Sequence, residues 1–326
     1  MPWVIRDVVR DVNRSVARRW RAIDPLLPAP DDLPEGCSSP LVVSGPDGRP
    51  AALAVCRHQR IPDDSLNQTW GAIHRFQLIP RVKGTDTAPA LDRILAQWRD
   101  HLATIPVARD DDSAAIITWP TRDITGVRAL QRYGFQPMAV IAARLARRST
   151  PSVPASANGH DRGRLAIREA RLDDFATVSE FEMGVVRYDA NFGGSVPRPA
   201  TTTLLRADVR TRLSRTPTWT WLAERDGRPV SLITVQPPHD ATWLRPLTGK
   251  DRVAYLQTGF VVPDERGRGT GEQFVRYVHE RLDEARIDLT LLHYAQVNPL
   301  SGPFWSRLGY RPLWTIWEVR PAAALR

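Results

Sequence analysis

The segment 255–282 places an apolar strand, a proline and three closely spaced glycines directly before an amphipathic helix. The strand pattern covers 255–261 and the helix pattern covers 272–282. The glycines between them are Gly267, Gly269 and Gly271. Glycine lets successive backbone N–H groups point into one concavity, where the helix dipole adds positive potential. Together with the charges of Arg266 and Arg268, the segment predicts a strand–turn–helix unit that binds an anion such as a diphosphate.

Two familiar phosphate-binding loops do not fit this segment. A G-x-G-x-x-G loop would need a further glycine where Glu272 or Phe274 stands, and no Gly-Lys-Ser/Thr follows for a nucleoside triphosphate. The run from Arg266 to Gly271 reads R-x-x-G-x-G. It resembles the coenzyme A pyrophosphate motif of the GNAT acetyltransferase superfamily, although a plain tight connection between strand and helix also fits.

A second motif lies downstream. The apolar run 289–294 is followed by Asn298. In the GNAT family, an Asn after the fifth strand is followed seven places on by an aromatic residue, usually Tyr, and eleven places on by Gly-Phe. Here those places hold Trp305 and Gly309 with Tyr310 beside it. With two motifs in the right order and register, the second half of the chain is similar to a GNAT acetyltransferase.

The sequence also repeats its features on either side of 148–164, a segment rich in Pro, Ser and Gly that predicts a linker. The recurring pairs are Asp47-Gly48-Arg49-Pro50 with Asp226-Gly227-Arg228-Pro229, Leu78-Ile79-Pro80 with Val261-Val262-Pro263, and Arg132-Tyr133-Gly134-Phe135 with Arg307-Leu308-Gly309-Tyr310. Such a long period indicates duplication of a large unit. We therefore expect two tandem GNAT-like domains, 1–147 and 165–326, in a plan similar to that of the mycothiol synthase family.

The resemblance implies an α/β (α+β) fold, in which each domain has a mixed, mostly antiparallel sheet flanked by helices. It also implies that coenzyme A, as acetyl-CoA, binds between two diverging strands of the second domain. The residues it assigns to coenzyme A are Phe260, Val261, Val262, Arg266, Gly267, Arg268, Gly269, Thr270, Gly271, Asn298 and Trp305. No metal site is expected.

The first half departs from the motif. Its residues Lys83, Gly84, Asp86 and Ala88 stand opposite Arg266, Gly267, Gly269 and Gly271, and Asp123 and Leu130 stand opposite Asn298 and Trp305. A carboxylate at 86 would repel a diphosphate, and Cβ atoms at 86 and 88 would crowd the N–H groups. We expect the first domain to be degenerate, with a structural or substrate-shaping role.

The usual acid and base of the family are missing. Gln257 stands where many members have a basic Glu, and the indole of Trp305 cannot deliver a proton as the usual Tyr does. The sequence offers three substitutes for catalysis: His293, Tyr294 and Asp189. The resemblance places Tyr188, Asp189 and Gln257 at the acceptor. Three explanations stay open: other groups supply the proton transfers, the acceptor amine binds already unprotonated, or the reaction depends only on positioning of the reactants.

Composition and charge limit the kinds of ligand, metal site and membrane association that we expect. The formal net charge is +9 and the pI is near 10.3, which suits a polyphosphate ligand. The apolar stripe of the first helix favours core packing over nucleic-acid binding for its arginines. Only Cys37 and Cys56 are present, so neither a disulfide framework nor a zinc site is supported. No apolar run is long enough for a membrane span, and a cytoplasmic location is expected.

We therefore expect an acetyl-CoA-dependent N-acetyltransferase in which the amine of a small molecule attacks the thioester directly. One alternative is an acyltransferase that uses another donor, such as a longer acyl-CoA or an aminoacyl-tRNA. An alternative from another class is a non-catalytic sensor that binds acyl-CoA. Nucleic acid and membrane are not expected partners, and the sequence leaves the oligomeric state open.

Overall fold

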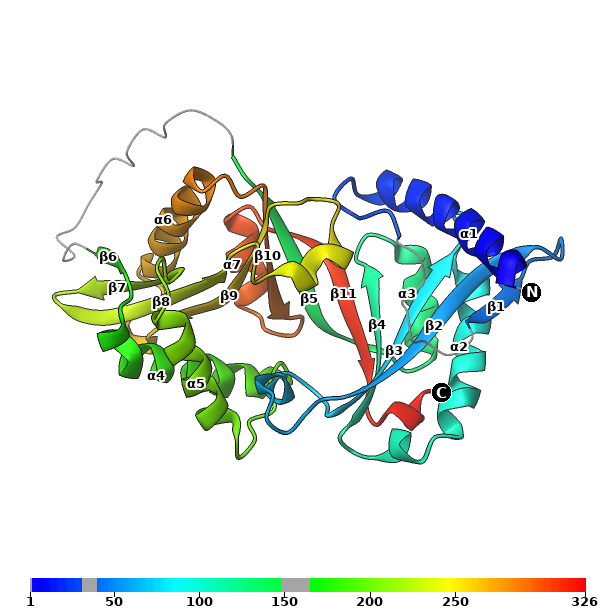
Figure 1. The fold of residues 1–326 in the computed structure, drawn as a ribbon, viewed down its shortest axis with the longest axis horizontal. Coiled ribbons are helices and arrows are strands. Elements are labelled where there is room, and N and C mark those ends of the chain that lie inside the picture. The colour runs from blue at the N-terminus through cyan, green and yellow to red at the C-terminus, as the bar shows by residue number, and fades with distance from the viewer. Residues whose placement is uncertain (1, 31–39, 148–164) are drawn as a thin grey trace.

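The computed structural model describes residues 2–30, 40–147 and 165–326, with side chains from residue 7 onward. The expected linker 148–164 and Cys37 lie outside the described residues. In the described part, strands from both halves form one sheet in the order β1-β2-β3-β4-β11-β5-β10-β9-β8-β7-β6 (Figure 1). The strands are β1 (Leu41–Ser44), β2 (Pro50–Arg60), β3 (His74–Val82), β4 (Ser113–Pro120), β5 (Gln136–Leu145), β6 (Ala166–Glu169), β7 (Thr220–Arg225), β8 (Arg228–Gln236), β9 (Val253–Val261), β10 (Leu289–Ala295) and β11 (Arg311–Val319).

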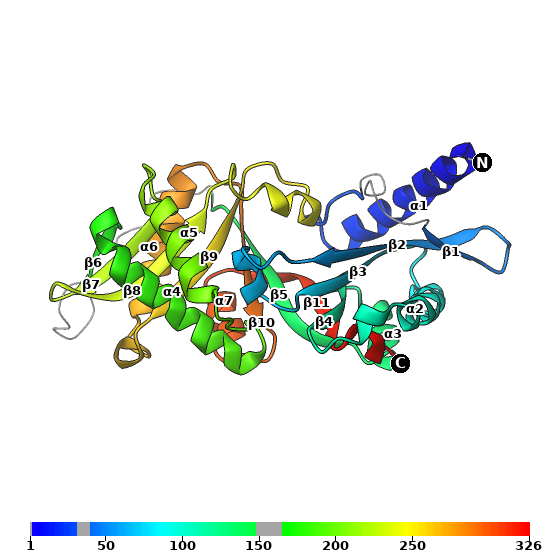
Figure 2. The ribbon, with the colours of Figure 1, turned by 60° about the horizontal axis from the view of Figure 1, so that its bottom comes forward.

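Helices cover both faces of this sheet. They are α1 (Pro2–Ile23), α2 (Ala88–Ala103), α3 (Ile124–Arg132), α4 (Phe175–Asp189), α5 (Thr201–Leu213), α6 (Thr270–Glu284) and α7 (Ser301–Arg307). Figure 2 shows α1 on one side of β1–β3 and α2 with α3 on the other. In the second half, α4 and α5 pack on Leu222 and Leu232, whereas α6 packs on neighbouring residues of the opposite face, such as Ala223 and Val230. The expected α/β fold with a mixed sheet and flanking helices is confirmed.

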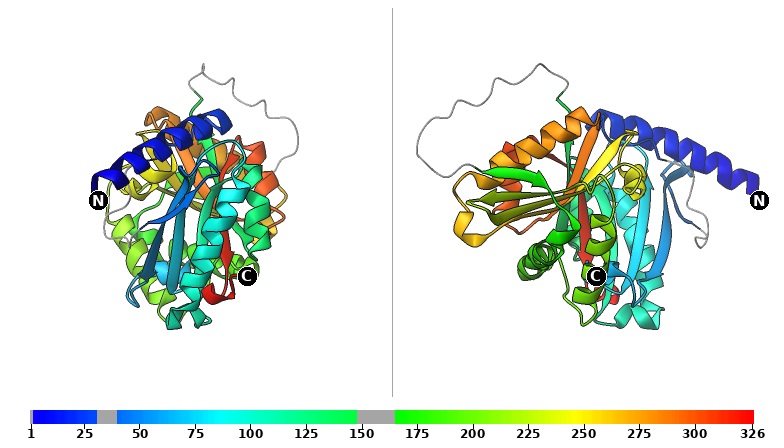
Figure 3. Two further views of the ribbon diagram at one scale, coloured as in Figure 1. Left: turned by 90° about the vertical axis from the view of Figure 1, so that its right-hand side faces the viewer. Right: turned by 60° about the vertical axis from the view of Figure 1, so that its left-hand side comes forward.

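The period of the apolar residues explains these layers. On α1, Val9, Val12 and Val16 are buried against Leu53 of β2, at the spacing that places side chains on one helix face. Figure 3 shows that α1 lies across the sheet with its N-terminal end pointing away from the second half. The expected basic face is present where side chains are described, because Arg10, Arg14, Arg18 and Arg21 are exposed. A core stripe with solvated arginines opposite therefore describes this helix.

The two halves share their final strands, which the sequence did not predict. β5, the last strand of the first half, pairs with β10 of the second half, and β11, the last strand of the second half, pairs with β4 of the first. β5 and β11 also pair with each other at the centre of the sheet. Each half therefore completes the sheet of the other, and the central strands join both halves into one continuous sheet.

The first half contains the same divergence of parallel strands as the second half, but side chains close it. The β3–β4 ladder ends at Leu78 and Ile117, and beyond it the indole of Trp119 is 2% exposed. A Cβ at Gly126 of α3 would lie 2.5 Å from that indole, so α3 packs directly on it. The carboxylate of Asp86 accepts the N–H of Ala88 at 3.2 Å, and thus occupies an amide that a diphosphate would need.

Candidate active site

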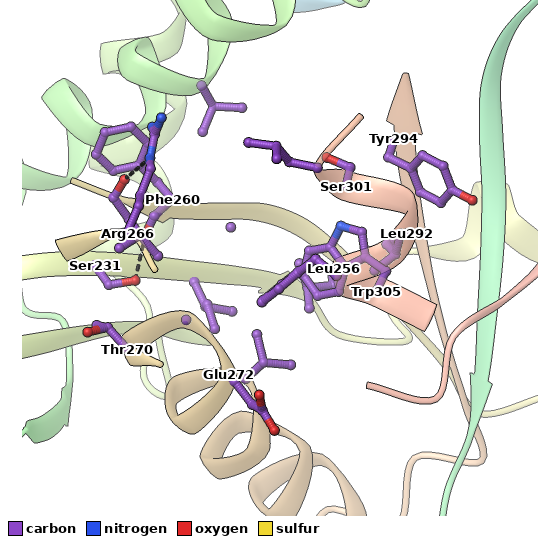
Figure 4. Close-up of a pocket in the computed structure, with 18 of the residues that line it drawn as sticks. Ser231, Leu256, Phe260, Arg266, Thr270, Glu272, Leu292, Tyr294, Ser301 and Trp305 are labelled. Carbon is purple, nitrogen blue, oxygen red and sulfur yellow. Dashed lines mark hydrogen bonds between the residues drawn. The ribbon is translucent and has the colours of Figure 1, made fainter. Parts of the chain in front are cut away.

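A cavity of about 730 Å³ opens where β9 and β10 diverge. Parallel pairing between them ends at Tyr255 and Leu291. Beyond that point the two strands separate, and the backbone edge of β9 that faces β10 is left without a strand partner. Figure 4 shows the cavity between Arg266 and Phe260, Thr270 and Glu272 of α6, and Ser301 and Trp305 of α7. The expected divergence of these two strands is therefore present.

The glycine loop, residues 266–271, lines one end of this cavity. Gly267 has φ of 72° and Gly269 has φ of 81°, a left-handed backbone that favours glycine at both positions. Gly271 is needed for another reason, because a Cβ there would approach Val261 at 3.3 Å and Phe304 at 3.4 Å. The loop leads into the N-terminus of α6, whose dipole favours an anion. The sequence prediction for this loop rested on the same glycines.

Arginines at the glycine loop are held by specific contacts. The guanidinium of Arg266 donates from Nε to the carbonyl of Val261 at 3.0 Å and lies 5.2 Å from the ring centre of Tyr188 on α4. Arg268 is half-exposed and reaches the carboxylate of Glu265 at 3.5 Å. Arg268 does not line the cavity, but its charge lies at the loop.

A buried carboxylate that the sequence analysis did not single out supports the glycine loop. Glu265 is 3% exposed, accepts the hydroxyl of Thr270 at 3.1 Å and pairs with Arg225 at 3.1 Å. Arg225 also donates to the Thr270 hydroxyl at 3.2 Å. The contacts tie the first residue of α6 to the end of β7, which fixes the direction of the helix N-terminus. No local pattern in the sequence pairs Arg225 with Glu265.

Alternate residues along the inner edge of β9 turn their backbone groups toward the gap. The N–H of Val262 donates to the carbonyl of Val230 on β8, so the alternation of an antiparallel ladder turns Gly259 and Val261 toward the gap. Gln257 is the extra residue of a bulge, because Thr258 pairs with Thr234 and Leu256 with Val235. Bulges of this kind redirect a side chain at a site. Val262 lies just outside the cavity lining.

The second motif shapes the wall opposite the glycine loop. The side-chain oxygen of Asn298 accepts the N–H groups of Leu300 and Ser301, at 3.1 and 3.3 Å, and so fixes the turn that leads into α7. The indole of Trp305 is 9% exposed and lies 3.5 Å from the position of a Cβ on Gly259. Both residues line the cavity. Trp305 thus forms an apolar floor against the free edge of β9.

Three ionisable groups meet at the other end of the cavity. The Oη of Tyr255 lies 3.1 Å from Nδ1 of His293, and both Asp189 and His293 line the cavity. Burial raises the pKa of Asp189 to about 6 and lowers the pKa of His293 to about 4. Burial, with the charge of Asp189 nearby, raises the pKa of Tyr255 well above its ordinary value. In the described part of the chain, the Asp189 carboxylate has neither a hydrogen-bond donor nor a cation beside it.

Aromatic and amide groups surround this end. Trp243, from the turn Thr242–Leu247, stacks on His293 with ring centres 6.0 Å apart and an interplanar angle of 25°. Its indole N–H donates to Gln236, whose amide in turn donates to Gln257 at 2.9 Å. The side chain of Gln257, which stands where many GNAT members have a basic Glu, is therefore held by the amide of Gln236. The sequence analysis assigned no role to Trp243, Tyr255 or Gln236.

The remaining sequence candidates gather at the same cavity. Tyr294, with its pKa raised by burial, lines the cavity near α7, where a Cβ on Gly302 would lie 3.7 Å from its ring. Tyr188 lies under Arg266, between the glycine loop and Asp189. His239 and Asp240 are exposed and lie outside this cavity. Among the described residues, no group of three or more His, Cys, Asp or Glu side chains could hold a metal ion.

The first half braces the segment that follows Asp189. Arg198 donates to both oxygens of Asp112, at 2.7 and 2.9 Å, and to the carbonyls of Gln68 and Gly71. The hydroxyls of Thr69 and Thr201 are 2.9 Å apart and buried. Closer to Asp189, the buried hydroxyl of Ser195 donates to the carbonyl of Val186 on α4. The acceptor end of the cavity is therefore anchored on the first half.

Comparisons with known proteins agree with this geometry. Residues 188–310 match the model of the acetyltransferase (GNAT) family. A GCN5-related N-acetyltransferase from Sphaerobacter thermophilus is similar in structure, with a TM-score of 0.55 and 14% identity over 95% of this chain and 91% of that one. A tandem GNAT protein from the clavulanic acid biosynthesis pathway aligns with a TM-score of 0.49 and 16% identity over 97% and 95% of the two chains. No curated protein matches the sequence. Within the described ranges no helix is long and apolar enough to cross a membrane.

Proposed function

Because residues 188–310 match the model of the acetyltransferase (GNAT) family, we propose that the protein transfers the acetyl group of acetyl-CoA to the amine of a small molecule. The observation that carries the proposal is a single cavity with a glycine loop at one end and an unpaired carboxylate, Asp189, at the other. One end suits a diphosphate and the other suits an ammonium. The strand edge between them suits the amide groups of pantetheine.

The donor site follows from the free polar groups along the cavity. The N–H groups of the glycine loop and the α6 dipole would hold the diphosphate, with charge from Arg266 and Arg268. The exposed backbone edge at Gly259 and Val261 would pair with pantetheine as a strand partner does. Phe260 and Trp305 border this path, and Asn298 keeps α7 in place. When bound, acetyl-CoA supplies an activated acyl carbon.

Asp189 is our candidate for the base. A carboxylate with a pKa near 6 is mostly ionised at neutral pH and can attract the protonated amine. It can then take the proton that the amine loses. The amine nitrogen forms a bond to the acyl carbon, the carbonyl oxygen gains the negative charge, and the C–S bond breaks when the carbonyl reforms. The coenzyme A thiolate leaves, and Tyr294, which lines the cavity and whose pKa is raised by burial, is our candidate to protonate it.

The shape of the acceptor end favours a small molecule. Tyr188 and His293 line the cavity together with Asp189, and Trp243 stacks on His293. Aromatic surfaces of this kind bind flat apolar bodies well. We also propose that the first domain, residues 1–147, binds no coenzyme A, because Trp119 and Asp86 occupy the corresponding places. A cytoplasmic location fits the supply of acetyl-CoA.

The proposal is tested by mixing the purified protein and acetyl-CoA with a panel of arylalkyl amines, polyamines and amino sugars, while free thiol release is followed. We expect release that depends on one class of amine and is lost in Asp189→Asn. Tyr277→Phe, on α6 away from the cavity lining, is the matched control. Binding of acetyl-CoA without turnover against any amine would favour a sensor and contradict the proposal.

A further inference from the structure

The hydrogen bond between Tyr255 and His293 constrains the chemistry of the acceptor end. The two residues lie on β9 and β10, at the point where parallel pairing stops. The phenol oxygen is 3.1 Å from Nδ1 of the imidazole. Trp243 contacts both rings, stacked on His293 and edge-on to Tyr255 at 5.0 Å. The imidazole is therefore held at one nitrogen and on one face, which leaves its Nε2 edge to point elsewhere.

The position of the phenol proton decides the tautomer of His293. In this bond one partner must donate, and either the phenol O–H or an Nδ1–H could do so. Among the described residues, Nδ1 is the one hydrogen-bond partner shown for the Tyr255 hydroxyl. If Nδ1 carried the proton, the phenol proton would lack an acceptor within the protein, which is unfavourable for a partly buried group. The phenol therefore donates to Nδ1, and a neutral imidazole then carries its proton on Nε2.

Nε2 is the free edge of this ring. His293 lines the cavity, and its Nε2 bonds to no other group in the described part of the chain. An imidazole that is neutral, with Nε2 protonated, is a hydrogen-bond donor on that edge and has no lone pair there to accept a proton. A base at Nε2 would require the opposite tautomer.

We infer that Tyr255 is a positioning residue that holds His293 in the Nε2–H tautomer, so that His293 donates a hydrogen bond to the oxyanion formed from the thioester. This inference rests on the proposed function for the identity of the oxyanion. The amine proton goes to Asp189, and His293 neither gains nor loses a proton in the step. The charge on the carbonyl oxygen is stabilised by a fixed donor while the C–N bond forms and before the C–S bond breaks.

The tautomer can be observed without any acceptor. Two-bond proton–nitrogen correlation spectra of the protein labelled at histidine nitrogens distinguish a protonated Nε2 from a protonated Nδ1, and His293→Gln identifies the signals. We expect His293 to show a protonated Nε2 and an unprotonated Nδ1 at pH 7, in roughly tenfold excess or more over the other tautomer. A predominant Nδ1–H in the wild-type protein would overturn the inference.

Variants separate the role of Tyr255 from general packing. Tyr255→Phe removes the donor and keeps the ring, so the Nδ1–H tautomer should become clearly populated while coenzyme A affinity, measured by calorimetry, stays within about twofold. Tyr294→Phe, one residue from His293 on the same strand, is the control and should leave the tautomer unchanged. If Tyr255→Phe keeps only the Nε2–H form, Tyr255 does not set the tautomer. A protein that showed the expected tautomer but bound no coenzyme A would contradict the proposed function and leave the tautomer result intact.

Discussion

Replacing Asp189 with Asn should stabilise the fold while it removes activity. The carboxyl has a pKa of about 6 in the folded protein against a reference of 3.8, because it is buried without a partner. Ionisation therefore costs the folded state 1.36 × (6 − 3.8), or about 3 kcal/mol, once the pH is well above 6. Asn resembles the protonated acid in shape and pays no such cost.

The pH dependence follows from the direction of the shift. The folded pKa is raised, so the protonated carboxyl contributes its full stability below pH 3.8 and loses it as the pH rises through 6. The advantage of Asp189→Asn should be about 3 kcal/mol at pH 7.5 and about half of that at pH 5. Urea unfolding of both proteins at the two pH values measures it. The reasoning is refuted if the variant is less stable than the wild type at pH 7.5, or if the gap is the same at both pH values.

Substitutions at two further positions test the cavity and the segment that supports it. Trp305→Ala should cost about 3–5 kcal/mol of stability and weaken coenzyme A binding, since it leaves a cavity beside Gly259. Trp305→Phe should keep most of the turnover, because the indole supplies no proton. A large loss of turnover in the Phe variant would contradict this reasoning. Arg198→Met should cost about 1–2 kcal/mol, since it removes the guanidinium that bonds to Asp112 and to the carbonyls of Gln68 and Gly71. It should also speed hydrogen exchange over 190–201 while coenzyme A affinity stays within about twofold. Unchanged exchange there would show that the first half does not brace the acceptor end.

The sequence was most informative where function depends on backbone shape. The left-handed backbone at Gly267 and Gly269 and the close approach at Gly271 require glycine, so the residue type itself records the local structure. The divergence of β9 and β10 was expected from the family resemblance that the two motifs carry. The acid and base could not be assigned in the same way, because the pKa of Asp189 depends on residues distant in sequence that bury it.

The exchange of final strands was beyond sequence reasoning for a physical reason. β5 and β11 are both apolar strands, each following a helix that ends in a similar Gly-containing turn, at Gly134 and Gly309. Either strand satisfies the local pattern in either half of the sheet. Only long-range pairing decides between the two arrangements. For the same reason, the contacts of Arg198 with the first half had no signal in the sequence.

The central claim is that the glycine loop of the second half binds the diphosphate of acetyl-CoA and that the first half binds none. Calorimetric titration of the full chain with coenzyme A tests it most directly, with Gly269→Asp compared with Gly84→Asp, the same change at a left-handed glycine of the corresponding loop in the first half. We predict one site per chain, lost in Gly269→Asp and kept in Gly84→Asp, with both variants folded by circular dichroism. Two sites of similar affinity, or unchanged binding in Gly269→Asp, would contradict the account.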